Sequence, residues 1–141
     1  MGVVLLYNSI LIAVDLANVA NVKSLIDHAS AHGSSNSKII LLNVVEEIPR
    51  WAEVELPRGT QDKSVKASRD ELGGLAASAG VDVGVEVRVG HPYKTILEVA
   101  EEKNADLIIV ASHQPGLQDY FLGSTAAKVV RHATCSVLVV R

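Results

Sequence analysis

Five apolar runs divide the chain, and four of them are nearly continuous in valine, isoleucine and leucine. They cover residues 10–15, 38–45, 81–89, 106–111 and 136–140. A strand that is covered on both faces, as in a parallel sheet between helices, has this continuous pattern. The run at 81–89 instead alternates valine with glycine or charged residues, which is typical of a strand with one face exposed to solvent. We therefore expect the third strand at an edge of the sheet.

Apolar residues at helical spacing fill the intervals between these runs, around residues 22–29, 65–79, 96–103 and 126–133. The glycine pair at 73–74 weakens the second of these helices. Strands that alternate with helices predict right-handed crossovers. The sequence therefore predicts a single α/β domain over residues 1–141, with a doubly wound five-stranded parallel sheet in the order 3-2-1-4-5 and helices on both faces. Residues 46–63 are expected to form a long irregular loop, which is a lid, a subunit contact or an ordinary surface connection.

Composition removes several classes of function. The net charge is −3 and no basic run is present, so a nucleic-acid partner is not expected. The single cysteine, Cys135, can form no internal disulfide and precedes an apolar strand, where cysteine is typically a small buried residue. The apolar N-terminus lacks the charged start of a signal peptide, and no stretch is long enough to span a membrane. We expect a cytoplasmic protein without membrane contact.

Two polar segments are expected to meet where the strand order reverses. Open α/β sheets bind ligands outside the carboxyl ends of their strands at this point, which here falls between the first and fourth strands. Asp15 ends the first strand, and Ala111, Ser112 and His113 lead from the fourth strand into a loop. That loop ends in Gly123-Ser124-Thr125, which would open the last helix.

Each of these groups has a functional and a structural interpretation. The Gly-Ser-Thr segment could hold a phosphate through backbone N–H groups and the helix dipole, or Ser124 could simply cap the helix. Asp15 could accept hydrogen bonds from an adenosine or cap the following helix. His113 could contact a phosphate, act as a base or have a structural role. The sequence has no P-loop, carboxylate pair, nucleophile–base pair or metal-ligand cluster, so no catalytic residue and no metal ligand is predicted.

Four segments together resemble the universal stress protein family. They are ILIAVD, LLNVVE, VGHPYKTILEVAEEKNADLIIVASH and LGSTAAKVVRHATCSVLVVR, and the resemblance runs from about residue 9 to the C-terminal residue. The stretch 89–141 is the most specific part and is similar to a subgroup with an ASHxP motif and an LGSxAAxVVRHAxCSVLVVR segment. The resemblance implies a Rossmann-like fold and a homodimer or higher homo-oligomer. In that dimer the last strands pair across a two-fold axis through Val137, Leu138, Val139 and Val140.

Many members of this family bind ATP or AMP through a motif of glycine, two residues, glycine, nine residues, glycine and Ser or Thr. Ala111 and Gln114 stand at the first two glycine positions, eight residues rather than nine precede Gly123, and Gly123-Ser124 matches. The family aspartate matches Asp15, and Ala17 stands where a serine is usual. The resemblance implies a site for ATP or AMP, with or without Mg²⁺. Its residues would be Ala13, Asp15, Val44, Ala111, Ser112, His113, Gly123, Ser124 and Thr125.

Three functions follow from these observations. The favoured one is a stress-response module that binds ATP or AMP and responds to the ligand. The lost glycines favour the second, a stress protein that binds no nucleotide and acts through dimer or partner contacts. The third is a weak ATPase, which no acid, base or metal cluster in the sequence supports.

Overall fold

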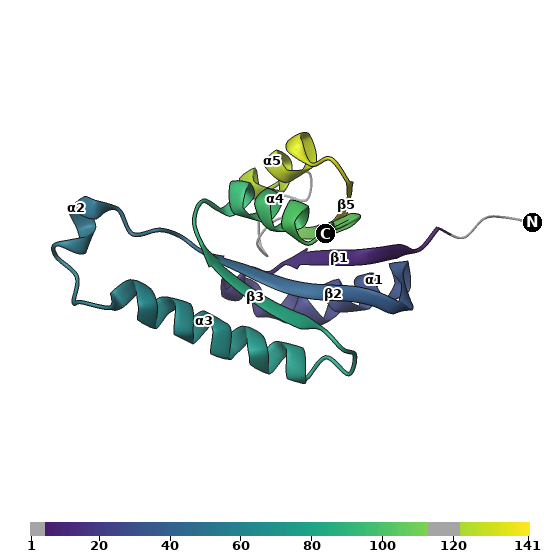
Figure 1. Cartoon of the computed structure of the whole chain (residues 1–141), viewed down its shortest axis with the longest axis horizontal. Coiled ribbons are helices and arrows are strands. Elements are labelled where there is room, and N and C mark those ends of the chain that lie inside the picture. Colours follow the sequence, from purple (N-terminus) through teal and green to yellow (C-terminus); the bar gives the residue numbers. More distant parts are fainter. Residues whose placement is uncertain (1–4, 113–121) are drawn as a thin grey trace, which may run out of the picture.

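A computed structural model describes residues 5–112 and 122–141 of the chain (Figure 1). Strands and helices alternate as the hydrophobic pattern predicts. The elements are β1 (Tyr7–Ala13), the 3-10 helix η1 (Leu16–Asn21), α1 (Val22–His32), β2 (Gly33–Val45), α2 (Arg50–Glu53), α3 (Thr60–Ala77), β3 (Gly84–Val89), α4 (Pro92–Glu102), β4 (Leu107–Ala111), α5 (Ser124–His132) and β5 (Ser136–Val140).

The five strands form one sheet in the order β3-β2-β1-β4-β5, and every pairing is parallel. This confirms the predicted fold class, strand order and edge position of β3. At the centre, Leu11 pairs with Ile40 on one side and with Ile108 on the other. The strand order reverses between β1 and β4, which places the expected ligand crevice above their carboxyl ends.

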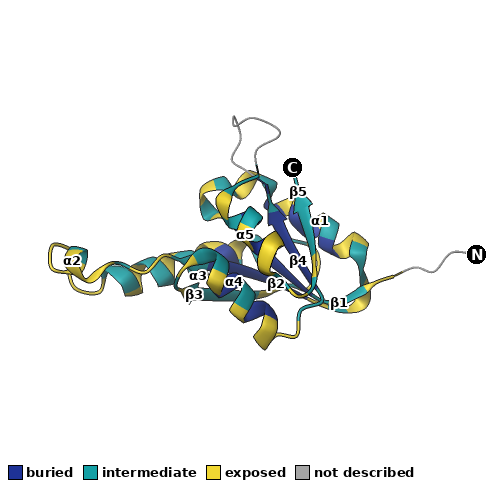
Figure 2. Ribbon diagram, turned by 90° about the horizontal axis from the view of Figure 1, so that it is seen from above, coloured by how far each residue is buried: buried dark blue, intermediate teal, exposed yellow. Residues whose placement is uncertain are grey.

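Two apolar clusters lie on the two faces of this sheet. Figure 2 shows buried residues along the strands. Helices α1 and α3 cover one face, where Leu25 and Leu72 pack against β1 and β2 residues such as Ile12. Helices α4 and α5 cover the other face, where Val99 and Val129 pack against Leu11 and its neighbours. All six of these side chains are at most 1% exposed, and burying each one contributes about 1.5–3 kcal/mol. Residues that alternate along β1 therefore stabilise opposite layers.

The segment 46–63 is more ordered than we expected. It contains the single-turn helix α2 and the first residues of α3, and Gln61 fixes its base. The Gln61 side chain accepts a hydrogen bond from Ile48 N (2.9 Å) and donates one to Glu46 O (3.4 Å). Figures 1 and 2 show α2 well away from the sheet, with Trp51 78% exposed. The expectation of an irregular loop is therefore wrong for residues 50–53 and 60–63 and right for the rest of this segment.

Helix α3 also passes through the glycine pair without interruption. A Cβ added at Gly73 or Gly74 would meet nothing within 4 Å, so no close contact requires glycine there. Each glycine costs a helix about 0.5–1 kcal/mol. Burial of Leu72 and packing of Leu75 and Ala76 against the sheet offset this cost.

Two further properties concern chemistry outside the sheet. In the part of the chain that the structure describes, no helix has the length and apolar character that crossing a membrane requires.

Cys135 is a free, half-buried thiol, and desolvation by burial raises its pKa above the ordinary value. A raised pKa keeps the thiol protonated and makes it a poor nucleophile, in agreement with its interpretation as a small core residue.

Arg88 on β3 connects the sheet edge to α4. Its guanidinium donates to Glu86 (2.6 Å) and to Glu102 (2.7 Å), and these hydrogen bonds raise the pKa of Arg88. The same hydrogen bond from Arg88 lowers the pKa of the Glu102 carboxyl below its ordinary value of 4.5. A carboxyl whose pKa is lower in the folded state stabilises the fold above its unfolded pKa, and this stabilisation is lost as the pH falls through the folded pKa.

We therefore predict that Glu102→Gln lowers the urea midpoint of unfolding slightly at neutral pH. The difference from the wild-type protein should shrink as the pH falls from the ordinary value of 4.5 through the lowered pKa of the folded state, because both proteins then carry a neutral side chain. Urea unfolding at several pH values measures this difference. Glu98→Gln is the matched control, since Glu98 is exposed on the same helix and makes no salt bridge with any residue in 5–112 or 122–141. An equal effect of both substitutions at every pH would contradict the prediction.

Candidate functional site

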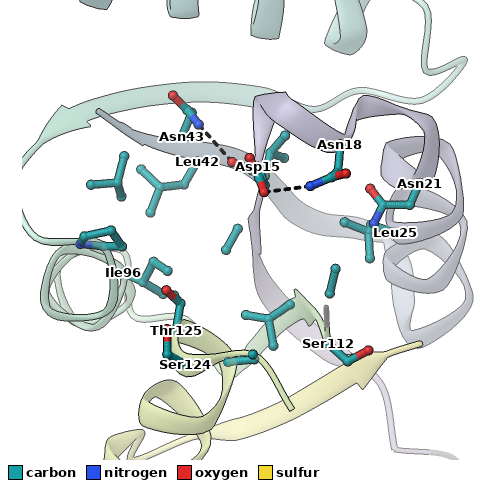
Figure 3. Close-up of a pocket in the computed structure, with 18 of the residues that line it drawn as sticks. Asp15, Asn18, Asn21, Leu25, Leu42, Asn43, Ile96, Ser112, Ser124 and Thr125 are labelled. Atoms are coloured by element: carbon teal, nitrogen blue, oxygen red, sulfur yellow. Dashed lines mark hydrogen bonds between the residues drawn. The ribbon is translucent and has the colours of Figure 1, made fainter. Parts of the chain in front are cut away.

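A cavity of about 460 Å³ lies at the carboxyl edge of the sheet, between the ends of β1, β2 and β4. Residues from η1 and α1 form one wall, and residues from the starts of α4 and α5 form the opposite wall (Figure 3). Its lining residues are Ala13, Val14, Asp15, Asn18, Asn21, Leu25, Leu42, Asn43, Val44, Glu46, Pro92, Ile96, Val110, Ala111, Ser112, Gly123, Ser124, Thr125 and Ala126. The cavity thus occupies the reversal of strand order, where open α/β sheets bind ligands.

Eight of the nine predicted site residues line this one cavity: Ala13, Asp15, Val44, Ala111, Ser112, Gly123, Ser124 and Thr125. The ninth, His113, lies outside the described residues. Residues more than one hundred positions apart in the sequence are therefore brought together as the strand order predicted. Their role in binding a nucleotide stays a prediction.

Asp15 begins the 3-10 helix rather than ending the strand. Strand β1 stops at Ala13, and the Asp15 side chain caps η1 by accepting a hydrogen bond from Ala17 N at 2.9 Å. Its second carboxylate oxygen accepts a hydrogen bond from Asn18 Nδ2, also at 2.9 Å. The side chain is exposed and lines the cavity, so its carboxylate has lone pairs left for a ligand. The capping role that the sequence allowed is confirmed, and it leaves the binding role open.

Asn43 fixes the floor of the cavity. It is 8% exposed, and its Nδ2 donates to Val14 O at 2.9 Å, while Val14 N donates to Leu42 O at 2.8 Å. These two bonds hold the end of β1 against β2 after their regular pairing stops at Ala13. These bonds therefore fix the position of Val14, the residue that precedes Asp15.

The opposite wall is the beginning of α5. Gly123 is the N-cap residue of this helix and has no side chain that could cap it, so the expectation that Ser124 is the capping residue is wrong. The backbone N–H groups of Ser124, Thr125 and Ala126 have no acceptor within the helix, because the first turn of any α-helix leaves such donors. All three residues line the cavity. Together with the helix dipole, these donors favour a negatively charged ligand group on this wall.

Position 123 needs glycine because a larger residue would not fit there, and not because of the backbone conformation. Its φ of −56° and ψ of 153° are open to any residue, but an added Cβ would lie 2.8 Å from the Ser112 carbonyl oxygen. Gly123 N also donates to this oxygen at 2.6 Å. The end of β4 and the start of α5 are thus in direct backbone contact, and Gly123 has a structural role independent of any ligand.

Several cavity residues were not predicted from the sequence. Asn18, Asn21, Asn43, Glu46, Pro92 and Ile96 line the cavity, and none of them was assigned to a ligand from the sequence. Asn18 lies three residues after Asp15, but its backbone is not helical (φ −134°, ψ 56°), so helical spacing did not indicate their contact. Among residues 5–112 and 122–141, no group of three or more histidine, cysteine, aspartate or glutamate side chains could hold a metal ion.

The fold and the site define a doubly wound α/β protein with a ligand cavity at its topological switch point. The model of the universal stress protein family matches residues 6–141, and the chain belongs to this family. Universal stress protein G of Salmonella typhimurium is 30% identical over 145 residues, and the alignment covers 96% of this chain and 100% of that protein. A putative universal stress protein of Staphylococcus aureus is 33% identical over 143 residues, covering 96% and 84% of the two chains.

Solved structures share the fold. Hypothetical protein MJ0577 superposes with a TM-score of 0.78 at 26% identity, covering 96% of each chain. A universal stress protein in complex with cAMP gives a TM-score of 0.68 at 24% identity, covering 96% and 97%. The universal stress protein from Archaeoglobus fulgidus in complex with dAMP gives 0.66 at 15% identity, covering 96% and 99%. These likenesses confirm the predicted Rossmann-like fold.

Proposed function

We propose that this protein binds an adenine nucleotide, AMP or ATP, in the cavity at the switch point and acts as a ligand-responsive module in a stress response. One observation carries the proposal. The cavity opposes an oriented carboxylate, Asp15, to a wall of backbone N–H donors at the start of α5. A nucleotide has the matching polarity, with hydroxyl and amine donors at the nucleoside end and a negatively charged phosphate at the other.

The size and lining of the cavity support this assignment. Its volume of about 460 Å³ falls within the range of about 300–1,000 Å³ that is typical of small-molecule sites. We assign the nucleoside end to Ala13, Asp15, Val44 and Ala111, and the phosphate end to Ser112, Gly123, Ser124 and Thr125. The predicted role of His113, which lies outside the described residues, stays a prediction from the sequence. Any Mg²⁺ would enter with the phosphates, since Mg²⁺ keeps several waters and binds nucleotide sites largely through phosphate oxygens.

The neighbours add independent support for the chemical class of the ligand. Two universal stress proteins of the same fold were solved with cAMP and with dAMP, and both ligands carry adenine. The altered glycine positions, Ala111 and Gln114, argue that the phosphates here rest on the α5 wall more than on the loop backbone.

The direct test is to denature freshly purified protein and identify any released nucleotide by chromatography, then to titrate AMP and ATP by calorimetry with and without Mg²⁺. We expect about one adenine nucleotide per chain. Neither released nucleotide nor binding heat would reject the proposal and favour a stress protein that acts through its protein contacts.

Asp15→Ala is predicted to weaken AMP binding by about 10- to 100-fold, because a hydrogen bond to a charged group contributes about 1.5–3 kcal/mol. The substitution also removes the η1 cap, which costs about 0.5–2 kcal/mol of stability. Calorimetry measures the affinity, and circular dichroism at the titration temperature checks that the variant is folded. Unchanged affinity in a folded variant would remove Asp15 from the site.

We also propose that the protein forms a homodimer, or a higher homo-oligomer, through β5. This strand is the edge of the sheet beside β4, and Val137, Leu138, Val139 and Val140 are only half-buried in the single chain. An apolar edge strand with unpaired backbone groups favours pairing with another strand. A second copy of β5 across a two-fold axis would supply it.

A further inference from the structure

Asp15 and Asn18 form a hydrogen-bonded pair on the wall of the cavity (Figure 3). Asn18 lies inside η1, but its φ of −134° and ψ of 56° are not helical. Its backbone N donates to Asp15 O at 3.0 Å, and its side-chain Nδ2 donates to Asp15 Oδ2 at 2.9 Å. The backbone departs from the helix at the residue whose side chain turns back to the carboxylate.

This pair restrains the carboxylate from both sides. Oδ1 accepts from Ala17 N and Oδ2 accepts from Asn18 Nδ2, so neither oxygen can leave its position without breaking a bond. An ionised carboxylate is an acceptor with about four lone-pair positions, and two of them stay open here. Because Asp15 is exposed, the Ala17 bond alone would let Oδ2 move in the solvent. Asn18 is the side chain that prevents this.

The contact also fixes the orientation of the Asn18 amide. A carboxylate donates no hydrogen bond, so the amide must present its NH₂ group to Asp15. The carbonyl oxygen of the amide then points away from Asp15 and can accept a hydrogen bond. Asn18 itself lines the cavity. This wall therefore presents acceptors, and a ligand must bring N–H or O–H donors to it.

We propose that Asn18 is a positioning residue that fixes the Asp15 carboxylate toward the cavity, and that the Asp15–Asn18 pair selects ligands with hydrogen-bond donors at the nucleoside end. The inference rests on the proposed function for its ligand, and the pair itself is a property of the free protein. The donor is a ribose hydroxyl or the exocyclic amine of adenine. AMP, dAMP and IMP distinguish these sources, since dAMP lacks one hydroxyl and IMP lacks the amine.

Asn18→Asp is the informative variant. It places two carboxylates at hydrogen-bonding distance, and such a pair strongly favours holding one shared proton. Below the raised pKa of the shared proton, an O–H group replaces the N–H group of asparagine and restores the bond to Asp15. Above it, the two carboxylates repel one another. We expect AMP binding about tenfold weaker than that of the wild-type protein at neutral pH, with the ratio returning toward one as the pH falls to about 5.

Asn21→Asp is the matched control. Asn21 lines the same cavity, starts α1 without a side-chain capping bond and makes no hydrogen bond to Asp15. The substitution adds the same charge to the same wall without creating a shared proton. Glu46, the other acidic residue described on this cavity, is present in all three proteins, and so is the phosphate of the bound AMP. The ratio of variant to wild-type affinity at each pH therefore isolates the pair.

A recovery at low pH that occurs in Asn18→Asp and not in Asn21→Asp supports the proposal. Equal pH dependence of the two variants, or wild-type affinity in Asn18→Asp at neutral pH, overturns it. A wild-type protein that binds AMP, dAMP and IMP equally overturns the selection by donors.

A measurement without ligand separates this inference from the proposed function. The melting temperature of Asn18→Asp should fall, relative to that of Asn21→Asp, as the pH rises from about 5 to 8, because the shared proton is lost. If the wild-type protein binds no nucleotide but this difference is present, the pair is real and the proposed function is wrong. If the two variants melt alike at every pH, the pair does not couple and the inference is rejected.

Discussion

Gly123→Val is expected to destabilise the protein by about 1–3 kcal/mol, the usual cost of forcing extra atoms into a packed site, and to weaken AMP binding more than about tenfold. The first Cβ would already lie 2.8 Å from the Ser112 carbonyl oxygen, and this partner is backbone that no rotamer change can move aside. The start of α5 must shift away from the end of β4. The N–H groups of the cavity wall move with it.

Urea unfolding and AMP calorimetry on the same preparation measure both effects. Gly74→Ala is the control, because Gly74 lies in the last turn of α3 and a Cβ added there meets nothing within 4 Å. This control should bind AMP normally and gain about 0.5–1 kcal/mol of stability. A Gly123→Val variant with normal stability and normal affinity would show that neither the backbone contact nor the assigned phosphate end is correct. Lost stability with intact affinity would leave only the structural role of Gly123.

The hydrophobic pattern predicted the fold because a parallel sheet leaves a strong signal in the sequence. Central strands such as β4 are covered on both faces, so their residues are continuously apolar, and the alternation in β3 identified the edge. The ends of elements were less accurate. Strand β2 starts at Gly33 rather than 38, because the polar stretch before Ser37 forms its own hydrogen bonds and Ser37 Oγ donates to Tyr7 O at 2.6 Å. The bond to Tyr7 depends on a strand that is distant in the sequence, and no local pattern encodes it.

The candidate site was predictable where it depended on topology. Asp15 and the Gly123-Ser124-Thr125 segment had to meet once the strand order reversed between β1 and β4. The finer roles were not readable. Gly123 and Ser112 are far apart in the sequence and meet only in the folded chain. The sequence therefore allows two explanations for this glycine, a turn or a phosphate site. The structure adds a steric one, because a Cβ at this position would clash with the Ser112 carbonyl oxygen. Asn18 was missed for a similar reason, since its effect is exerted through the carboxylate of Asp15.

Val139→Pro is expected to raise the dissociation constant of the proposed dimer by about 10- to 100-fold while leaving the single chain folded. Ser112 N donates to Val140 O, so the backbone polar groups of Val140 face β4. Backbone groups alternate in direction along a strand, and those of Val139 therefore face outward, where a partner strand would bind. Proline at 139 removes one outward N–H group in each protomer and none from the β4 pairing. A two-fold interface loses this bond twice, at about 0.5–1.5 kcal/mol each.

Sedimentation velocity over a range of protein concentrations measures the dissociation constant, and Val139→Ala is the control that removes side-chain packing but keeps the N–H group. A dimer as tight in Val139→Pro as in Val139→Ala would place the contact elsewhere, and a wild-type protein that is monomeric throughout would reject the dimer. AMP calorimetry on the monomeric variant adds a further test. A single protomer forms the described cavity of about 460 Å³ from its own residues. Separated protomers should therefore bind AMP with the affinity of the dimer, and a lost affinity would mean that strand pairing at β5 shapes the end of β4 and the cavity beside it.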